Sequence, residues 1–412
     1  MAALVQSHLR KTSNRRAGDR LRVVVLGYIV RGPMGGMSWH HLNYVAGLVA
    51  MGHDAVFIEI GDEYESCYDP RRHRMSNDAS YGIEYASGVF ARLSLGNRWA
   101  YYDAAAKTWR GPMAERAPEF CASADLVINV SGVNPIDPWF AEVPHRVLID
   151  TDPAFTQIRH LTDPAAREAA KRHTAFFSFG ENIPAGTASV PDDGIPWQAT
   201  RQPVALDRWP VLPGQREGKF TTVMLWESYP SREHAGRFYG MKSQSFADFV
   251  DLPARVGSIF RIAVGGTNLP HDALSAKGWR FCNPLEVARD PWTYQEFIGD
   301  SKAEFTVAKH GYVASRCGWF SERSACYLAT GRPVVTHDTG FSDWLRGGGR
   351  GVLGFATIEE ATAAIEAVNA DYATHCRAAR EIAETYFAAE HVLGTLIERA
   401  FAGAAKTRAA AR

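Results

Sequence analysis

Residues that could move a proton stand next to a glycine-rich turn near the start of the chain. Gly35 and Gly36 are followed by His40 and His41, and Asp152 comes shortly after an apolar run further on. A histidine titrates near neutral pH, so it is suited to take a proton from a hydroxyl group. Two adjacent histidines on a helix point about 100° apart, so only one can face a given site. We predict His40 and Asp152 as catalytic residues, with the glycine pair and His41 on the side of a hydroxyl-bearing acceptor.

Both catalytic candidates also have a purely structural interpretation. His40 could cap or pack its own helix. Asp152 precedes Pro153 and could form a turn or cap a helix. The sequence leaves these alternatives open.

Side chains that could neutralise a phosphate stand in the second half of the chain. Lys309 and His310 follow a strand-like run at 303–308, and Arg323 stands at the start of a helix. A guanidinium can bind a phosphate through two parallel hydrogen bonds, and a helix N-terminus favours an anion. Each basic side chain could equally be a solvated surface charge. The pattern nevertheless favours a site for a diphosphate.

The elements that would position these residues begin with residues 21–60. This stretch contains an apolar strand, a glycine-rich turn, an amphipathic helix that Ser38 can cap, and a second strand. It is half of a nucleotide-binding α/β unit. A dinucleotide fingerprint would place G-x-G-x-x-G directly after the first strand, but the glycine after Gly27 comes only five residues later. A nicotinamide-dependent oxidoreductase is therefore the least favoured function.

The first half of the chain keeps an α/β rhythm. Strand-like runs at 126–130, 146–149 and 175–179 each end in polar or glycine residues, with Glu181 after the third. Ligands of doubly wound sheets bind beyond the carboxyl ends of the strands, so these loops should converge on one crevice. Residues 60–120 have weak periodicity, and we expect an irregular insertion over that crevice.

A second α/β series follows a stretch dense in proline and glycine at 183–219, which we interpret as an interdomain linker. A chain of 412 residues suits two domains. We predict two Rossmann-like, doubly wound domains that face a central cleft. The predicted divisions are a flexible basic tail at 1–20, an acceptor-binding domain at 21–205, a donor-binding domain at 206–390, and a terminal helix and tail at 391–412.

Several motifs resemble those of GT-B glycosyltransferases of the group-1 kind. The glycine pair with His40, followed by an apolar helix ending at Gly52, resembles the opening of these enzymes. The segment SERSACYLATGRPVVTHDTGF, residues 321–341, resembles their donor-site segment. The resemblance covers roughly residues 21–60 and 220–400. It implies the GT-B architecture, with a nucleotide sugar bound by the second domain and an acceptor by the first.

The resemblance also implies roles for particular residues. Lys242 matches the lysine that binds the donor phosphates, and Gly265 closes the second strand of the donor domain. The loop that touches the donor sugar and phosphates matches Asp338, Thr339, Gly340 and Phe341. The family neutralises the leaving diphosphate with lysine, arginine and helix N-termini. We therefore expect a metal-independent hexosyltransferase that needs no cofactor besides its nucleotide-sugar co-substrate, with a UDP-sugar as the family default.

One feature of the family is missing. Its retaining members carry two glutamates eight residues apart, and those positions here hold Gly318 and Cys326. Glu322 lies one helical turn before Cys326, on about the same face, so it could accept the ribose hydroxyls from a shifted place. It could equally cap the helix or pair at its start. Retention or inversion of the anomeric configuration therefore stays open.

Bulk composition narrows the partners. Lysine plus arginine equals aspartate plus glutamate at 45 each, so we expect no nucleic acid partner. No apolar run approaches the ~18 residues of a transmembrane helix. Six scattered cysteines without a C-x-x-C pair are typical of a reduced, cytoplasmic protein. The acceptor and the oligomeric state are not predicted.

Two alternatives keep the predicted fold. A nucleotide-sugar 2-epimerase acts on the donor alone, although the 60–120 insertion argues for an acceptor pocket. A non-catalytic protein that binds a glycan or a partner, as a coat protein does, stays open because the glutamate pair is missing. We favour a glycosyltransferase that transfers a sugar from a nucleotide-diphosphate sugar to a hydroxyl group of a glycan, lipid or small metabolite.

Overall fold

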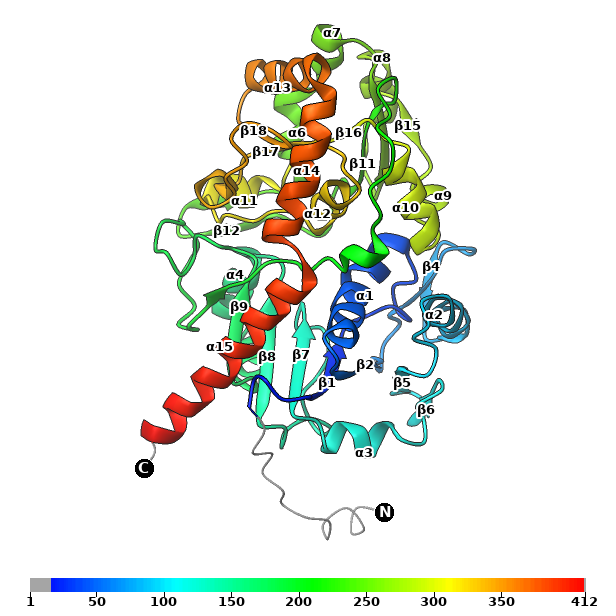
Figure 1. The fold of residues 1–412 in the computed structure, drawn as a ribbon, viewed down its shortest axis with the longest axis vertical. Coiled ribbons are helices and arrows are strands. Elements are labelled where there is room, and N and C mark those ends of the chain that lie inside the picture. Colours follow the sequence, from blue (N-terminus) through cyan, green and yellow to red (C-terminus); the bar gives the residue numbers. More distant parts are fainter. Residues whose placement is uncertain (1–15, 411–412) are drawn as a thin grey trace.

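The computed structural model describes residues 16–410, with side chains described for residues 16–402. Residues 1–15 of the predicted basic tail, and residues 411–412, lie outside the described residues. The chain forms two α/β units, one above the other in Figure 1, each built on its own sheet. The predicted fold class, two doubly wound Rossmann-like domains, is confirmed.

The N-terminal unit has an eight-stranded sheet in the order β10-β9-β8-β7-β1-β2-β5-β6. Every neighbouring pair is parallel except β5 and β6. Val23, Val24 and Val25 of β1 are fully buried, as a strand covered on both faces requires. The strands are β1 (Arg22–Leu26), β2 (Asp54–Ile60), β5 (Trp99–Asp103), β6 (Thr108–Arg110), β7 (Leu126–Val130), β8 (His145–Asp150), β9 (Ala175–Ser178) and β10 (Gln198–Ala199).

The remaining elements of this unit cover the sheet or extend from it. A separate antiparallel hairpin, β3 (Cys67–Asp69) with β4 (Arg74–Ser76), lies beside α2. The helices are α1 (Gly35–Ala50), α2 (Ser80–Arg92), α3 (Ala117–Ala122), α4 (Phe155–Thr162) and α5 (Pro164–Lys171).

The C-terminal unit has a six-stranded, fully parallel sheet in the order β15-β14-β11-β16-β17-β18. Its strands are β11 (Phe220–Leu225), β14 (Phe260–Gly265), β15 (Phe281–Cys282), β16 (Ala303–Thr306), β17 (Val334–His337) and β18 (Val352–Phe355). A hairpin of β12 (Arg232–His234) and β13 (Arg237–Tyr239) follows β11. The helices are α6 (Lys242–Phe246), α7 (Leu252–Val256), α8 (His271–Ala276), α9 (Pro284–Val287), α10 (Pro291–Gly299), α11 (His310–Ser315), α12 (Glu322–Ala329), α13 (Ile358–Ala370) and α14 (Tyr372–Tyr386).

The last helix, α15 (Ala389–Ala410), leaves the C-terminal unit and returns to the N-terminal one (Figure 1). It packs on α1, and its Phe401 ring stacks on His145 of β8 with ring centres 3.8 Å apart. The two units are therefore joined twice, by the segment 200–219 and by this helix. None of the described helices is both long and apolar enough to cross a membrane.

Three local expectations differ from the structure. Residues 60–120 are not irregular, because the aromatic strand β5 pairs with β2 and extends the main sheet. The predicted linker is shorter, since Gln198–Ala199 still pairs with β9. Helix α1 begins at Gly35, so Ser38 does not cap it; the Ser38 hydroxyl donates to the carbonyl of Met34 instead.

Candidate active site

The loops that follow the strands of the two units meet in the cleft between them. Asp152 follows β8 of the N-terminal unit, whereas Lys309 follows β16 and Tyr229 follows β11 of the C-terminal unit. These residues touch across the cleft. Loops at the carboxyl ends of parallel strands are where doubly wound folds bind ligands. The structure therefore brings two of the predicted site residues, Asp152 and Lys309, into contact.

Asp152 is the centre of this contact. The Lys309 Nζ lies 2.9 Å from Asp152 Oδ1 and 2.7 Å from the Tyr229 hydroxyl. The hydroxyls of Tyr229 and Tyr312 both donate to the Asp152 carboxylate. Burial, reinforced by the Asp152 charge, raises the pKa of both tyrosines, so both stay protonated as donors. Asp152 is thus a carboxylate held by three donors rather than an unpaired base.

Lys242 begins α6 and is a buried cation without a carboxylate partner. Its side chain is 9% exposed, and its Nζ forms no hydrogen bond or ion pair with any other residue in the described part of the chain. Burial, together with the nearby charges of Arg323 and Lys309, lowers the pKa of Lys242 to about 7. A buried ammonium among other cations is costly unless an anion joins it. This lysine therefore marks a place for an anionic ligand.

Arg323 does not extend into that place. Its Nε pairs with Glu304 in the core of the C-terminal unit, and its two Nη atoms donate to the Val223 carbonyl at 2.8 Å and to Thr306 Oγ1 at 2.9 Å. Burial lowers the pKa of Arg323, but the neighbouring Glu304, Tyr294 and Glu322 together outweigh burial and raise it. All three guanidinium nitrogens therefore already donate a hydrogen bond inside the protein.

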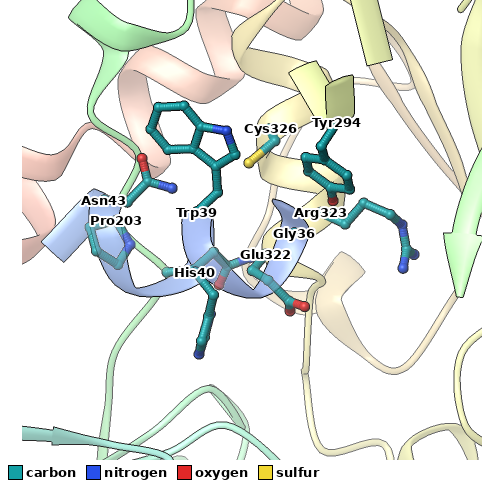
Figure 2. Close-up of a pocket in the computed structure, with 10 residues that line it drawn as sticks. Gly36, Trp39, His40, Asn43, Pro203, Tyr294, Glu322, Arg323 and Cys326 are labelled. Atoms are coloured by element: carbon teal, nitrogen blue, oxygen red, sulfur yellow. The ribbon is translucent and has the colours of Figure 1, made fainter. Parts of the chain in front are cut away.

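His40 of α1 and Glu322 of α12 face the same small cavity between the two units. Figure 2 shows the two side chains extending from different helices, with Tyr294 and Cys326 above them in the view. His40 Nδ1 is buried and has no hydrogen-bond partner among the described residues. Burial lowers the pKa of His40, although the Glu322 carboxylate opposes that shift. A neutral imidazole at pH 7 is able to accept a proton.

Of the predicted acceptor-side glycines, Gly36 lines the same small cavity as His40 and Glu322, but both glycines serve the packing of α1. The N–H of Gly35 donates to the Ala288 carbonyl at 2.7 Å, and a Cβ on Gly35 would lie 2.2 Å from the Asp290 carbonyl oxygen. Gly36 packs in the same way on the Tyr294 ring. The glycine pair therefore lets α1 approach α10 of the other unit. It does not form a ligand loop.

His41 and Glu181 are also held inside the protein. His41 is fully buried on the inner face of α1, where its ring lies edge-on to Tyr28. Glu181 pairs with Arg201, whose guanidinium stacks 4.5 Å above the Trp344 ring. The structure brings neither predicted acceptor-side residue into contact with Asp152 or Lys309.

The predicted donor loop after β17 is organised by its own residues. Asp338 accepts hydrogen bonds from the Gly340 N–H and the Ser342 hydroxyl, and the Thr339 hydroxyl donates to the Trp319 carbonyl. Phe341 is buried against Phe320. Gly265 ends β14, and His310 begins α11 beside Lys309 and accepts the Gly240 N–H at 3.3 Å. Their donor-binding roles stay predictions.

Sequence reasoning missed the tyrosines and one asparagine. Tyr312 stands three residues after Lys309, a spacing that places both on one face of a helical turn, so that signal was available. Tyr229 and Asn182 carried no such signal. Asn182 Nδ2 reaches from the N-terminal unit to the carbonyls of Arg316 and Gly340, both at 3.0 Å.

The turn after β1 is filled by the protein itself. The buried Glu59 carboxylate accepts the backbone N–H groups of Ile29 and Val30 at 2.7 Å and of Arg31 at 2.8 Å. Backbone N–H groups at this turn bind the pyrophosphate in dinucleotide-binding folds. An internal carboxylate therefore occupies the phosphate position of the N-terminal unit. Among residues 16–402 no group of three histidine, cysteine or acidic side chains could hold a metal ion.

Solved structures similar to this chain are glycosyltransferases. One is an alpha-glucosyltransferase in complex with UDP and a 13-mer DNA, at TM-score 0.56 and 10% identity, covering 93% of this chain and 100% of that chain. Another is Alr3699/HepE of Anabaena in complex with UDP and glucose, at TM-score 0.52 and 11% identity, covering 93% and 98%. No family model matches the chain, and no curated protein matches it. The chain has the GT-B fold.

This GT-B fold confirms the architecture that the motifs predicted, and it agrees with the place of Lys242 in the second unit. A third similar structure, AviGT4, is described as a glycosyltransferase involved in Avilamycin A biosynthesis, at TM-score 0.50 and 13% identity, covering 93% and 98%. At such low identity these likenesses establish the fold of this GT-B protein and leave its chemistry to the site.

The sequence-based expectation excluded nucleic acid as a partner, and that exclusion is wrong. Several of the similar GT-B structures are glucosyltransferases in complex with DNA, so a chain of this fold can hold nucleic acid. The inference failed because it used the net charge, 45 basic against 45 acidic residues. Net charge averages the whole surface, whereas binding of phosphates depends on where cations gather.

Proposed function

We propose that this GT-B protein transfers a sugar from a nucleotide-diphosphate sugar to a hydroxyl-bearing acceptor. The observation that carries the proposal is Lys242, a buried ammonium that no other described residue hydrogen-bonds or pairs with, and whose charge interacts with that of Lys309. A diphosphate is the anion that a GT-B donor brings to that position. Similar structures contain UDP or UDP-glucose, which makes a UDP-sugar the first donor to test.

The chemistry needs charge stabilisation on one side and a proton acceptor on the other. The bond between the anomeric carbon and the diphosphate oxygen breaks, and its electron pair leaves with the nucleoside diphosphate. Lys242 and Lys309 neutralise that leaving group, so the transfer needs no metal ion. The acceptor oxygen bonds to the anomeric carbon and loses its proton to a base.

Two residues are candidates for that base. His40 carries an unpaired, buried Nδ1, and the lowered pKa of its ring keeps it neutral at pH 7. Asp152 is a carboxylate between the two units, but it is shared among three donors. Replacing each in turn, as His40→Gln and Asp152→Asn, separates them: the base is the residue whose loss lowers kcat at least a hundredfold while UDP still binds at least as tightly as to the unmodified protein.

The first experiment measures nucleotide binding. Isothermal titration with UDP, GDP, ADP, CMP and dTDP should give binding by at least one of them, and Lys242→Ala should weaken it by at least tenfold. Lys277→Ala is the matched control, because Lys277 is exposed and paired with Asp251. Absence of binding by every nucleotide, or equal binding by Lys242→Ala, would contradict the proposal.

The second experiment separates transfer from epimerisation. Incubation with the bound nucleotide sugar alone should release nucleoside diphosphate slowly, by transfer to water, and leave the remaining sugar unchanged at its second carbon. Chromatography and NMR of the products measure both. Inversion of the configuration at the second carbon, without release of nucleoside diphosphate, would show that the protein is an epimerase and not a transferase.

A reducing compartment suits the proposed enzyme. All six cysteines are free thiols, and Cys67, Cys121, Cys317 and Cys326 are buried. We place the protein in the cytoplasm on this ground. Fractionation of cells that express a tagged chain tests the assignment.

A further inference from the structure

A separate cavity of about 280 Å³ opens in the N-terminal unit, where β7 and β8 end. Its walls come from the loop 131–137, from the first turns of α4 and from one face of α5. Its size is close to the lower end of small-molecule sites. It lies beyond the carboxyl ends of β7 and β8, one strand away from the β1–β7 pair where the winding of the sheet reverses, and ligands of doubly wound sheets bind beyond these strand ends.

This cavity is adjacent to the cleft. Asp150 and Thr156 line the cavity. Asp152 and Phe155 belong to the same turn, between β8 and the start of α4, and they contact Lys309 instead. A ligand in the cavity therefore has one end next to Asp152. That is the position of an acceptor whose reacting hydroxyl faces the donor.

His160 presents a hydrogen-bond acceptor to the cavity. Its Nδ1 lies 2.7 Å from Asp193 Oδ2, and the Trp197 indole N–H donates to the other oxygen of Asp193 at 3.0 Å. In the tautomer that donates from Nδ1 to this carboxylate, Nε2 of His160 keeps a lone pair. No other described residue hydrogen-bonds to that Nε2. A ring that is 3% exposed and fixed in this way is suited to receive a hydroxyl.

A second buried acceptor lies beside the same cavity. His173 Nδ1 donates to the Ala170 carbonyl at 2.8 Å, and burial lowers the pKa of His173 to about 4, so its Nε2 accepts. The donor is Asn129 Nδ2 at 3.1 Å, which leaves Asn129 Oδ1 buried without a partner among the described residues. Asn129 is fully buried and does not line the cavity, so its amide fixes His173 in the cavity wall rather than binding a ligand.

The remaining lining favours a neutral ligand. Arg172 at the rim is paired with Asp137 at 2.6 Å, and the lining holds equal numbers of arginines and aspartates, namely Arg159 and Arg172 with Asp137 and Asp150. The floor is apolar, built from Leu148, Ile149, Ala166, Ala169 and Ala170. An apolar floor beneath hydrogen-bond acceptors suits a ring with one hydrophobic face and several hydroxyl groups. A polyanion finds no surplus of positive charge here.

We propose that this cavity binds a hexose unit of the acceptor, which makes the acceptor a glycoside or a glycan. That the bound sugar is the acceptor rests on the proposed function. That the cavity binds a sugar ring does not depend on the proposed function. The hexose places a hydroxyl next to Asp152, and His160 receives another hydroxyl of the same ring.

The test uses the full chain, saturating UDP, and three probes: the methyl α-D-glycosides of glucose, galactose and mannose. Saturation-transfer NMR measures their binding. At least one should bind, and Ala169→Trp, which fills the cavity from α5, should weaken it at least tenfold. Ala165→Trp is the control, because Ala165 is exposed on the same helix outside the cavity. His160→Gln should weaken the same probe at least fivefold, at unchanged UDP affinity.

Each outcome decides a different statement. If UDP binds and none of the three glycosides does, the cavity is no hexose site and the inference fails while the proposed function stands. Equal binding by Ala169→Trp and Ala165→Trp also overturns it. A different result is that a glycoside binds, that Ala169→Trp abolishes this binding, and that UDP does not bind. In that case the sugar site stands and the proposed function fails.

Discussion

Lys309 Nζ lies 2.9 Å from Asp152 Oδ1, which joins two units of the protein through residues 157 positions apart. Phe155 of the N-terminal unit and Tyr229 of the C-terminal unit place their rings 5.1 and 4.4 Å from the same ammonium. The pair holds the cleft together and places a protein anion next to a lysine predicted to bind the donor. If Lys309 binds the donor diphosphate as predicted, the diphosphate and Asp152 share one cation.

Breaking this pair should loosen the cleft and change donor binding in opposite directions. Asp152→Asn removes the competing anion, so UDP should bind more tightly, by about threefold. Lys309→Met removes the cation and should weaken UDP. The two side chains are 29% and 12% exposed, so a double-mutant cycle on unfolding should give a coupling of about 1 kcal/mol. Weaker UDP binding in Asp152→Asn would contradict the shared-cation arrangement.

The control for that cycle is the ion pair of Arg172 with Asp137. Its side chains are 53% and 52% exposed, so solvent screens it. The same cycle at this pair should give a coupling close to zero. A coupling equal to that of Asp152 with Lys309 would mean that burial at the cleft contributes nothing.

Donor affinity should fall as pH rises above 7. Lys242 has a pKa of about 7 in the free protein, and only its ammonium form attracts a diphosphate. Above that pKa the dissociation constant for UDP should rise by up to about tenfold per pH unit, until the pKa in the complex is reached. Titration calorimetry between pH 7 and 9, where UDP is fully ionised, measures this. Lys242→Ala should show a flat profile; a flat profile for the unmodified protein would contradict the assignment.

Removing Lys242 should also stabilise the protein without ligand. Its pKa falls from 10.5 in the unfolded chain to about 7 in the folded one, so between those values the unfolded state binds more protons and stability rises with pH. Lys242→Met removes that cost and should raise the free energy of unfolding by roughly 1–4 kcal/mol at pH 7. The gain should shrink as pH approaches 10. Urea unfolding at pH 7 and 9.5 measures it, and a destabilised variant would argue that Lys242 has an internal partner.

A methyl group at Gly35 should separate the two units. Its Cβ would lie 2.2 Å from the Asp290 carbonyl oxygen, a backbone atom that cannot turn aside, so Gly35→Ala should cost about 2 kcal/mol or more. Gly88→Ala is the control: Gly88 lies in helix α2 with nothing within 4 Å, and alanine there should stabilise by about 0.5–1 kcal/mol. Thermal unfolding measures both. Equal melting temperatures for the two variants would contradict the close approach.

Arg323 should prove to be a structural residue. Arg323→Met leaves Glu304 buried and unpaired, so the free energy of unfolding should fall by about 3 kcal/mol. The folded fraction should still bind UDP within tenfold of the unmodified protein, because the guanidinium nitrogens are bonded to Glu304, Val223 and Thr306. Chemical unfolding and UDP titration measure the two effects. Loss of UDP binding at normal stability would restore the predicted phosphate clamp.

The sequence predicted the parts of this protein that depend on neighbours along the chain. The strands around Val24, Ile128 and Val335 were recognisable because a strand covered on both faces must be apolar throughout. The two-domain GT-B architecture followed from the order of such segments. Lys242 was recognisable by its place after the first strand of the second unit, which the structure keeps.

Only the tertiary structure decided how those parts are used. Gly35 serves helix packing, Arg323 turns into the core, and Asp152 is paired with Lys309, because each outcome depends on a partner more than 15 residues away in the chain. The same holds for the cavity beside β7 and β8, whose lining is assembled from four separate segments. The spacing of hydrophobic residues along the chain is a local property that can be read from the sequence directly. The direction of a charged side chain is set by which distant group can compensate its burial, and that choice exists only once the two units are folded against each other.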